Sequence, residues 1–212
     1  MTNGGIPADT LNSAALQRAA LVVLAGGPCA GKTAIAHALV RVLPNAILLD
    51  KDFILGDWVD RLLLASQAGV DRDSTFYWKE VRPLEYRTLE AIAYDHLQMG
   101  KVVVLDAPLA SELNDAGWAA RIGRECATRG AGFLPVWVSV SAETAYRRMQ
   151  ARGAVRDHWK LTHWPEFLAR RSYDHPTQAK LILSNEDGTT VDEQVARVRS
   201  ALCTLDHQEA SQ

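Results

Sequence analysis

The sequence predicts a three-layer α/β domain in which helices cover both faces of a five-stranded parallel sheet. Its 212 residues, 48% of them hydrophobic, are enough for one domain with a full core. Short apolar runs alternate with stretches of helical periodicity, which is typical of parallel strands linked by helices. The carboxyl ends of such strands meet at one sheet edge, where ligands bind. Strands are expected at residues 21–25, 46–49, 101–105, 133–138 and 180–183.

The helices are predicted from the spacing of apolar residues and from residues that end a helix. Residues 33–43 place Ile35, Leu39 and Val42 on one helical face, and Pro44 follows the last turn. The same reasoning gives five more helices after this one. They are expected at residues 53–68, 77–99, 111–129, 142–151 and 191–205.

One domain is expected at residues 14–206, with a small helical lid at about residues 148–165. Residues 1–13 are rich in Gly, Thr, Asn and Pro and are predicted to form a flexible tail, as are residues 207–212. No apolar run approaches the roughly 18 residues that a membrane helix needs, and the N-terminus lacks a signal-peptide pattern. These observations predict a cytoplasmic protein that does not contact membranes.

Charge and cysteine content argue against two further classes of protein. Lys and Arg number 23 and Asp and Glu 25, a net charge of −2, whereas proteins that neutralise nucleic-acid phosphates usually show a basic excess. The three cysteines are widely spaced and form no CxxC pattern, which argues against a disulfide framework or a zinc site. The sequence therefore predicts that neither nucleic acid nor zinc is a partner.

A phosphate-binding motif lies between the first predicted strand and the first predicted helix. Residues 26–33 match the pattern GxxxxGK[ST], in which glycines let backbone N–H groups turn toward phosphate oxygens. Lys32 is expected to bridge the β- and γ-phosphates, and the Thr33 hydroxyl to coordinate Mg²⁺. The predicted site for ATP and Mg²⁺ consists of Gly26, Gly27, Pro28, Cys29, Ala30, Gly31, Lys32 and Thr33.

Cys29 lies inside this loop, and two interpretations of it remain open. In the first, it is a small residue whose backbone binds phosphate. In the second, Lys32 and the positive end of the helix lower the pKa of its thiol and make it reactive. The second interpretation makes Cys29 a site for chemical probes.

Asp52 is the candidate general base for a hydroxyl acceptor. It follows the second predicted strand, and a carboxylate at that edge faces the γ-phosphate, where it can take a proton. Asp50 is the alternative, since either carboxylate could face the cleft and either could instead cap the following helix. The guanine-reading pattern Asn-Lys-x-Asp of GTPases is absent, and ATPase motors are usually longer. A kinase is therefore favoured.

The chain resembles the P-loop kinases that include polynucleotide 5′-kinases, zeta-type toxins and chloramphenicol phosphotransferases. The residues that carry this resemblance are the loop at 26–33, Asp52, Asp106, Arg148 and Arg152. The resemblance covers nearly the whole folded chain and implies a P-loop NTPase fold. In that group the carboxylate after the second strand activates the acceptor hydroxyl, and this role is carried over to Asp52.

Metal and lid residues are expected at two further positions. Asp106 ends an apolar strand in the Walker B form and is expected to hold Mg²⁺, although in some relatives this strand end contacts the acceptor. In similar kinases the segment after the fourth strand is a lid over ATP. By this resemblance, Arg152 is expected to stabilise charge on the transferring phosphoryl group and Arg148 to contact the nucleotide. Residues 184–188 lie where similar kinases contact adenine.

The chain departs from the polynucleotide kinases at one position. Those kinases carry an Arg three residues after the catalytic Asp to hold the phosphate of the substrate, and here that residue is Leu55. This difference and the near-neutral charge argue against a nucleic-acid 5′-end as the acceptor. Five aromatic residues nearby suit a ring-bearing or otherwise uncharged small molecule: Phe53, Trp58, Phe76, Tyr77 and Trp78. The acceptor is expected to contact Asp50, Asp52, Phe53 and Arg82.

These features predict an ATP- and Mg²⁺-dependent kinase that phosphorylates a hydroxyl of a small molecule, such as an antibiotic or another natural product. One alternative is a nucleoside, nucleotide-sugar or polynucleotide 5′-hydroxyl kinase. A second alternative is a nucleotide-dependent regulatory or toxin-like protein. Catalysis is assigned to Asp52, Lys32 and Arg152, and a monomer or homodimer is expected.

Overall fold

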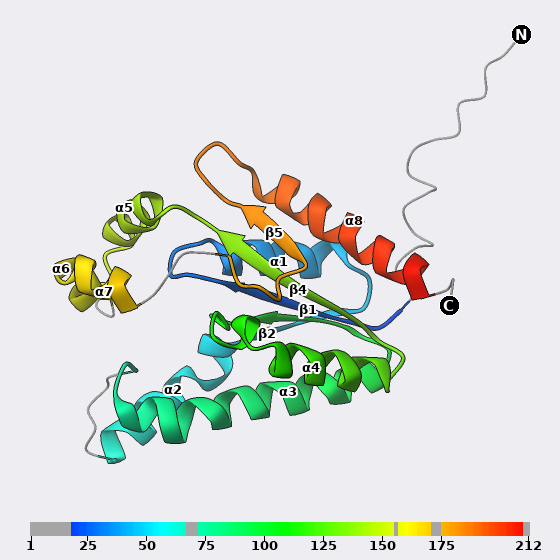
Figure 1. The fold of residues 1–212 in the computed structure, drawn as a ribbon, viewed down its shortest axis with the longest axis horizontal. Coiled ribbons are helices and arrows are strands. Elements are labelled where there is room, and N and C mark those ends of the chain that lie inside the picture. Colours follow the sequence, from blue (N-terminus) through cyan, green and yellow to red (C-terminus); the bar gives the residue numbers. More distant parts are fainter. Residues whose placement is uncertain (1–17, 67–71, 155–156, 171–174, 210–212) are drawn as a thin grey trace, which may run out of the picture.

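Five parallel strands form one sheet in the computed structural model, which describes residues 18–66, 72–154, 157–170 and 175–209 (Figure 1). The strand order is β2-β3-β1-β4-β5. Every strand lies within one residue of its predicted bounds, and the predicted three-layer α/β fold is confirmed. The strands are β1 (Ala20–Gly26), β2 (Ala46–Asp50), β3 (Val102–Asp106), β4 (Gly132–Ser139) and β5 (Leu181–Ser184).

Helices connect and cover these strands. Two short elements that are not α-helices, η1 (Tyr77–Val81) and η2 (Glu112–Asn114), precede α3 and α4. The α-helices are α1 (Lys32–Val42), α2 (Lys51–Ala65), α3 (Arg82–Gln98), α4 (Ala116–Ala127), α5 (Ala142–Arg152), α6 (His158–Thr162), α7 (Trp164–Arg170) and α8 (Val191–Glu209).

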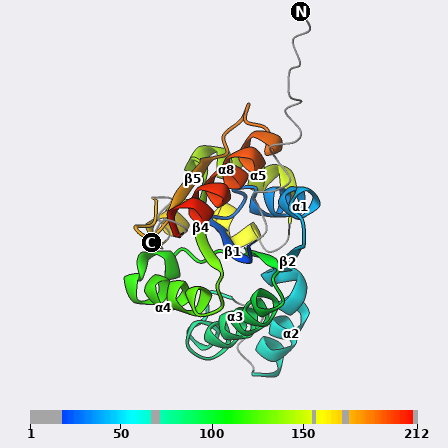
Figure 2. The ribbon, with the colours of Figure 1, turned by 90° about the vertical axis from the view of Figure 1, so that its right-hand side faces the viewer.

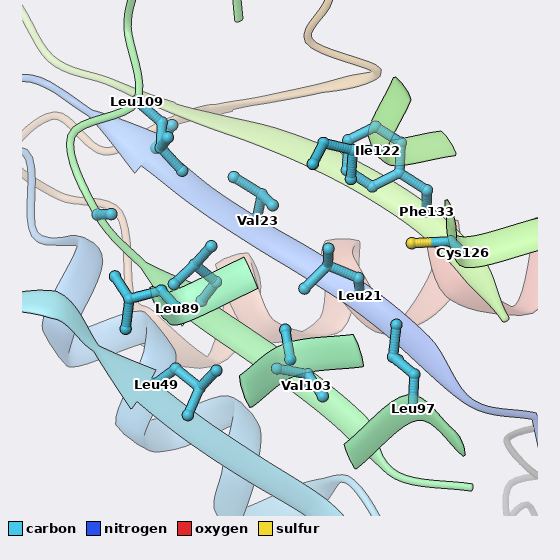
Figure 3. Close-up of a cluster of buried hydrophobic side chains, with 14 of the residues drawn as sticks. Leu21, Val23, Leu49, Leu89, Leu97, Val103, Leu109, Ile122, Cys126 and Phe133 are labelled. Carbon is cyan, nitrogen blue, oxygen red and sulfur yellow. The ribbon is translucent and has the colours of Figure 1, made fainter. Parts of the chain in front are cut away.

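The central strand β1 is buried on both faces, and its alternate residues belong to two different hydrophobic cores. Leu21 and Val23 pack with residues of α3 and α4 below the sheet in Figure 1, and Figure 3 shows this cluster. Val22 and Leu24 pack with residues of α1 and α8 on the opposite face. Figure 2 shows the same three layers from the side. This period of two follows from the pleat of a strand.

Two predicted helices are divided in the structure. The segment predicted as a helix over 77–99 begins with the π-helix η1 before α3. The segment predicted over 111–129 begins as the 3₁₀ turn η2, and α4 starts only after Asp115, whose side chain accepts a hydrogen bond from Gly117 N at 2.8 Å. An aspartate that caps a helix start explains the second break.

The two tails predicted at the ends of the chain lie partly outside the described residues. The tail predicted over 1–13 lies outside them, whereas α8 extends to Glu209, three residues into the predicted C-terminal tail. Within the described residues, no helix is both long and apolar enough to cross a membrane.

The strand order explains where the site lies. From β1 the chain moves to one side of the sheet for β2 and β3, and to the other side for β4 and β5. Ligands bind at such a switch point, outside the carboxyl ends of the strands. The loop after β1, the end of β3 and the start of α2 all lie at this edge (Figure 1).

Candidate active site

The phosphate loop joins β1 to α1, and close contacts explain two of its glycines. Gly31 precedes α1 with a φ of 89°, in the left-handed region that favours glycine. A Cβ on Gly31 would lie 2.3 Å from Nδ2 of Asn185, and a Cβ on Gly26 would lie 2.5 Å from the carbonyl oxygen of Val138. Neither position can therefore hold a larger residue without a shift of its neighbours.

Asn185, which follows β5, fixes the loop. Its Nδ2 donates to the carbonyl oxygen of Ala30 at 2.7 Å, while its backbone N–H donates to Ser139 O at 2.8 Å. Asn185 lies in the 184–188 segment, but its contact with the loop was not predicted. The only signal was its place directly after the fifth strand, because the bond to the loop joins residues that are 155 positions apart.

Lys32 folds back over its own loop. Its Nζ donates to the carbonyl oxygens of Gly26 and Gly27, both at 3.0 Å. Burial lowers the pKa of the Lys32 ammonium, while the negative charges of Asp106 and Asp52 oppose that shift. Lys32 therefore lies within electrostatic reach of Asp106 and Asp52, two of the three carboxylates that the sequence indicates.

Cys29 also adopts a left-handed backbone, with a φ of 59°. Burial raises the pKa of its thiol, and the positive charges of Arg152 and Lys32 only partly offset this effect. This direction is opposite to the lowered pKa that the second interpretation of Cys29 requires. Lys32 lies nearby as that interpretation required, but desolvation outweighs its charge.

Thr33 and Asp106 meet at the end of β3. The Thr33 hydroxyl donates to Asp106 Oδ2 at 2.6 Å, and Asp106 is buried. Burial raises the pKa of Asp106, whereas the charge of Lys32 and the hydrogen bond from Thr33 lower it. A hydroxyl and a carboxylate oxygen are hard ligands of the kind that Mg²⁺ uses, together with phosphate oxygens and water. The two residues therefore fit a magnesium site.

Asp50 and Asp52 have different environments although they are two residues apart. Asp50 Oδ1 accepts hydrogen bonds from the backbone N–H groups of Asp52 and Phe53 at 2.9 and 3.0 Å, so Asp50 caps α2. Asp52 is half exposed, and its Oδ1 pairs with Lys51 Nζ at 3.1 Å and with Arg72 Nη1 at 3.4 Å. The negative charge of Asp52 raises the pKa of Lys32, and the charges of both Asp50 and Asp52 raise the pKa of Asp106.

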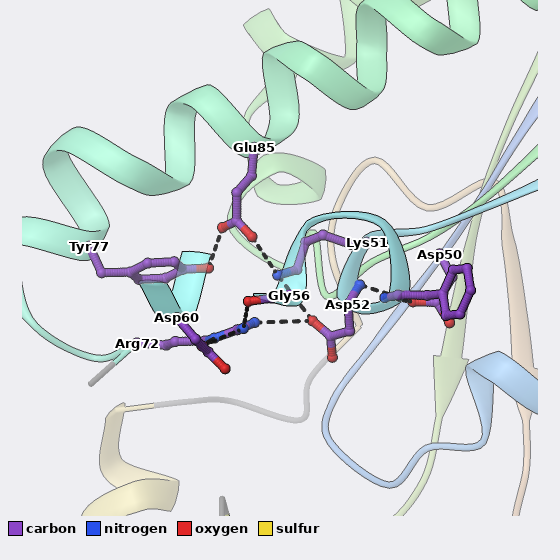
Figure 4. A network of polar contacts seen from close by, with 9 residues as sticks. Asp50, Lys51, Asp52, Gly56, Asp60, Arg72, Tyr77 and Glu85 are labelled. Carbon is purple, nitrogen blue, oxygen red and sulfur yellow. Dashed lines mark hydrogen bonds and ion pairs between the residues drawn. The ribbon is translucent and has the colours of Figure 1, made fainter. Parts of the chain in front are cut away.

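Three side chains behind Asp52 were not predicted from the sequence. Lys51 and Glu85 are buried and paired at 3.0 Å, and Arg72 contacts Asp52 from the segment after α2 (Figure 4). Lysine and arginine are usually exposed, and these contacts join residues that are 34 and 20 positions apart. No local pattern in the sequence indicates such pairs.

The predicted acceptor residues Phe53 and Arg82 differ in how they are held. Phe53 is 89% exposed at the start of α2. Arg82 pairs with both carboxylate oxygens of Glu112, and its guanidinium lies 4.5 Å from the ring centres of Trp78 and Tyr86. Arg82 therefore forms a fixed link between α3 and η2, and its contact with an acceptor remains a prediction.

The segment predicted to form a lid brings Arg152 to a buried carboxylate. Arg152 Nε and Nη2 donate to Asp157 Oδ2 at 2.9 and 2.5 Å, and Lys160 Nζ lies 3.2 Å from Asp157 Oδ1. The charge of Arg152 influences the pKa values of both Cys29 and Lys32, so this cluster lies beside the phosphate loop. Asp157 is completely buried and was not predicted.

Arg148 lies one turn before Arg152 on α5 and contacts a different acid. Its Nη2 donates to Asp187 Oδ1 at 3.1 Å, and Arg147 pairs with the other oxygen of Asp187 at 2.5 Å. Asp187 belongs to the 184–188 segment. Arg148 is thus joined to the segment that is predicted to contact adenine.

The histidines that follow α5 form no metal site within the described residues. There, no group of three or more His, Cys, Asp or Glu side chains could hold a metal ion. His163 stacks on Trp159 with ring centres 5.1 Å apart, and His175 lies 3.1 Å from Ser139 Oγ.

Comparison with known proteins gives this arrangement a family. A family model described as an AAA domain, AAA_33, matches residues 21–172, which is more than half of the chain. The chain belongs to the AAA_33 family. A comparison with curated protein sequences finds no match.

Solved structures with the fold of this AAA_33 protein include several kinases. APS kinase CysC of Mycobacterium tuberculosis, solved with AMPPNP and APS, is 21% identical, with a TM-score of 0.57 over 87% of this chain and 98% of that chain. Shikimate kinase of Bacteroides thetaiotaomicron is 19% identical, with a TM-score of 0.52 over 86% and 98% of the two chains.

A tunicamycin resistance protein of Deinococcus radiodurans has the same fold. It is 13% identical, with a TM-score of 0.54 over 87% of this chain and 96% of that chain. At these identities the likeness concerns the fold. The predicted P-loop kinase fold and the resemblance to this kinase group are confirmed.

Proposed function

We propose that this AAA_33 protein is an ATP- and Mg²⁺-dependent kinase that transfers the γ-phosphate to a hydroxyl of a small molecule. One observation carries the proposal. The half-exposed Asp52 carboxylate lies at the start of α2 within electrostatic reach of Lys32 in the phosphate loop and of Asp106 at the end of β3. In this proposal Asp52 serves as the base, Lys32 binds the γ-phosphate and Asp106 holds the metal ion.

In the proposed reaction, the acceptor O–H gives its proton to the Asp52 carboxylate while its oxygen attacks the γ-phosphorus. The bond from this phosphorus to the β–γ bridging oxygen breaks, and ADP leaves with that electron pair. Lys32 would leave the carbonyl oxygens of Gly26 and Gly27 to bind the β- and γ-phosphates. Alignment of the acceptor and the phosphate supplies most of the catalysis in such transfers.

Two further groups would balance the charge of the transferred phosphoryl group. Thr33 and Asp106 would hold Mg²⁺, which neutralises negative charge on the phosphates when it is bound. Arg152 uses Nε and Nη2 to pair with Asp157, and among the described residues its Nη1 has no hydrogen-bond partner. We therefore assign Nη1 to the transferring phosphoryl group.

The acceptor class rests on the residues beside Asp52. The Phe53 ring is almost fully exposed, and an apolar or aromatic part of an acceptor can pack on it. Asp60 pairs with Arg72 at 2.8 Å, so the cation next to Asp52 already has acidic partners. This environment favours an uncharged acceptor, such as an antibiotic or another natural product.

Arg72 also supports a second candidate function, the phosphorylation of a polynucleotide 5′-hydroxyl. Leu55 stands at the position of a phosphate-binding arginine, which counts against this function. In the folded chain, Nη1 of Arg72 lies 3.4 Å from Asp52 Oδ1, so an arginine is supplied from another segment. Its pairing with Asp60 places this candidate second.

The test measures ADP release from Mg-ATP in the presence of sugars, nucleosides, antibiotics or 5′-hydroxyl oligonucleotides. Lys32→Ala serves as the inactive control. Stimulation by one small molecule, with a gained phosphate detected by mass spectrometry, would support the proposal. Stimulation by oligonucleotides alone would support the second candidate. Tight ATP binding with no stimulated release by any acceptor would argue for a regulatory protein.

A further inference from the structure

Three polar side chains are buried directly behind Asp52, where α2, η1 and α3 meet. The Tyr77 hydroxyl donates to Glu85 Oε2 at 2.7 Å, and Lys51 Nζ donates to Glu85 Oε1 at 3.0 Å (Figure 4). Burial and the charge of Glu85 raise the pKa of Tyr77, so its hydroxyl stays protonated and acts as a donor. Both carboxylate oxygens of Glu85 are therefore occupied by donors.

Lys51 connects this buried group to the candidate base. Its Nζ lies 3.0 Å from Glu85 Oε1 and 3.1 Å from Asp52 Oδ1, so one ammonium group bridges two carboxylates. On the other side, Arg72 Nη1 contacts the same Asp52 oxygen at 3.4 Å. Arg72 is itself fixed by Asp60 at 2.8 Å and by the carbonyl oxygen of Gly56 at 3.1 Å. Asp52 is thus held between two cations, and each cation is anchored by another acid.

Stability alone does not account for the buried pair of Lys51 and Glu85. Removing two charges from water costs several kcal/mol per ion, and apolar side chains of similar size often stabilise a protein as well or better. A half-exposed aspartate without fixed partners exchanges between rotamers. A cation that contacts its carboxylate from a rigid, buried position restricts that motion.

We infer that Lys51, anchored by Glu85, is a positioning residue that holds the Asp52 carboxylate in place to accept the proton of the acceptor hydroxyl. This inference rests on the proposed function, since it takes Asp52 as the base. Lys51 itself does not contact phosphate in this arrangement, because its ammonium is buried between two carboxylates.

The decisive experiment replaces the buried ion pair by apolar residues in two backgrounds. Lys51→Met/Glu85→Leu is made in the wild type and in Asp52→Asn, and ADP release from Mg-ATP is measured with water as the acceptor. In the wild type, we expect kcat to fall about tenfold or more with little change in KM for ATP, because the base is misplaced. In Asp52→Asn, the same double change should cost less than about twofold.

A matched pair of single variants separates positioning from a general effect on α3. Glu85→Gln and Glu90→Gln make the same chemical change in two buried acids of one helix. Glu90 instead binds Trp118 Nε1 and Arg121, from α4. Glu85→Gln should slow ADP release several-fold, and Glu90→Gln should leave it unchanged. If the double variant does not fold, as judged by its thermal melt, Glu85→Gln carries the comparison between the two backgrounds.

Each result has a defined meaning. Equal losses with and without the Asp52 carboxylate, or equal losses in Glu85→Gln and Glu90→Gln, would overturn the positioning role and leave the proposed function intact. If Asp52→Asn releases as much ADP as the wild type, the assignment of Asp52 fails and this inference fails with it. Loss only when Asp52 is present would support the inference.

Discussion

Two charge clusters flank the phosphate loop, and they have opposite polarity. On the acceptor side, the side chain of Lys51 is 5% exposed and holds Asp52, which is 51% exposed. On the lid side, the side chain of Asp157 is 0% exposed and holds Arg152, which is 36% exposed. In each cluster a buried charge of one sign fixes a more exposed charge of the other sign.

The opposite charges of the two exposed residues suit the different groups that each would contact in the proposed reaction. A carboxylate suits the acceptor hydroxyl, whose proton must be removed, and a guanidinium suits the phosphoryl group, whose negative charge must be balanced. Both exposed groups act on Lys32, because Asp52 raises and Arg152 lowers the pKa of that lysine. In each pair, the buried member therefore positions the member that is available for chemistry.

The largest effect is expected for the exposed residue of the lid-side cluster. Arg152→Ala should lower the rate of ADP release from Mg-ATP about 10³-fold, because charge on the transferring phosphoryl group is no longer balanced. Binding of the analogue AMPPNP, measured by calorimetry, should change much less. Should AMPPNP affinity fall as far as the rate does, Arg152 would be a nucleotide-binding residue without a special role in the transition state.

The second-largest loss of ADP release is expected for Asp52, the exposed residue of the acceptor-side cluster. Asp52→Asn should keep AMPPNP binding and lower ADP release by about 10²-fold or more, in line with the loss of a general base. Asp50→Asn provides the matched control two residues away, since asparagine also caps a helix. Near-normal release in Asp52→Asn together with an inactive Asp50→Asn would move the base assignment to Asp50.

Replacement of Asp157, the buried residue of the lid-side cluster, should slow ADP release less, and only when Arg152 is present. Asp157→Asn should slow ADP release about tenfold, because the guanidinium loses its charged anchor and its fixed position. In the Arg152→Ala background the same change should cost less than about twofold. Equal costs in the two backgrounds, measured by steady-state kinetics, would mean that Asp157 supports the lid fold and not Arg152.

The sequence predicted most of the fold because its main signals are local. The buried strands are continuous apolar runs, and the phosphate loop is set by eight consecutive residues, 26–33. The points at which two of the predicted helices are divided were harder to predict. The helix expected over 111–129 contains its own start signal at Asp115, which apolar spacing alone does not reveal. The π-helix at Tyr77–Val81 also has no distinct spacing of apolar residues.

The candidate site was predicted less completely, because its supporting contacts are distant in sequence. Thr33 and Asp106 could be placed together, since each ends or follows a strand at the same sheet edge. The pairing of Lys51 with Glu85 depends on how α2 packs against α3, and the bond from Asn185 to the loop depends on β5. Such contacts follow from the tertiary fold and have no local pattern.

The helix cap at the acceptor side offers a test in which stability changes more than catalysis. Asp50→Ala removes the acceptor for the backbone N–H groups of Asp52 and Phe53. We expect the free energy of unfolding to fall by about 1 kcal/mol, a typical value for a lost cap. Chemical denaturation measures this loss, and Asp50→Asn should retain most of the stability. A much larger loss of ADP release than of stability would place Asp50 in the chemistry.

Cys29 provides the smallest and most local test of the lid-side cluster. Burial raises the pKa of its thiol and the charge of Asp157 raises it further, so at neutral pH alkylation should be slower than for a free thiol. Below that pKa the rate should rise with pH, since the thiolate is the reacting form.

Asp157→Asn lowers the pKa of the Cys29 thiol by removing a negative charge and should speed alkylation about twofold. Asp52→Asn, on the acceptor side, should leave the rate unchanged. Iodoacetamide labelling with peptide mass spectrometry distinguishes Cys29 from Cys126 and Cys203. Equal acceleration by both variants would show that the two clusters do not act on separate sides of the loop.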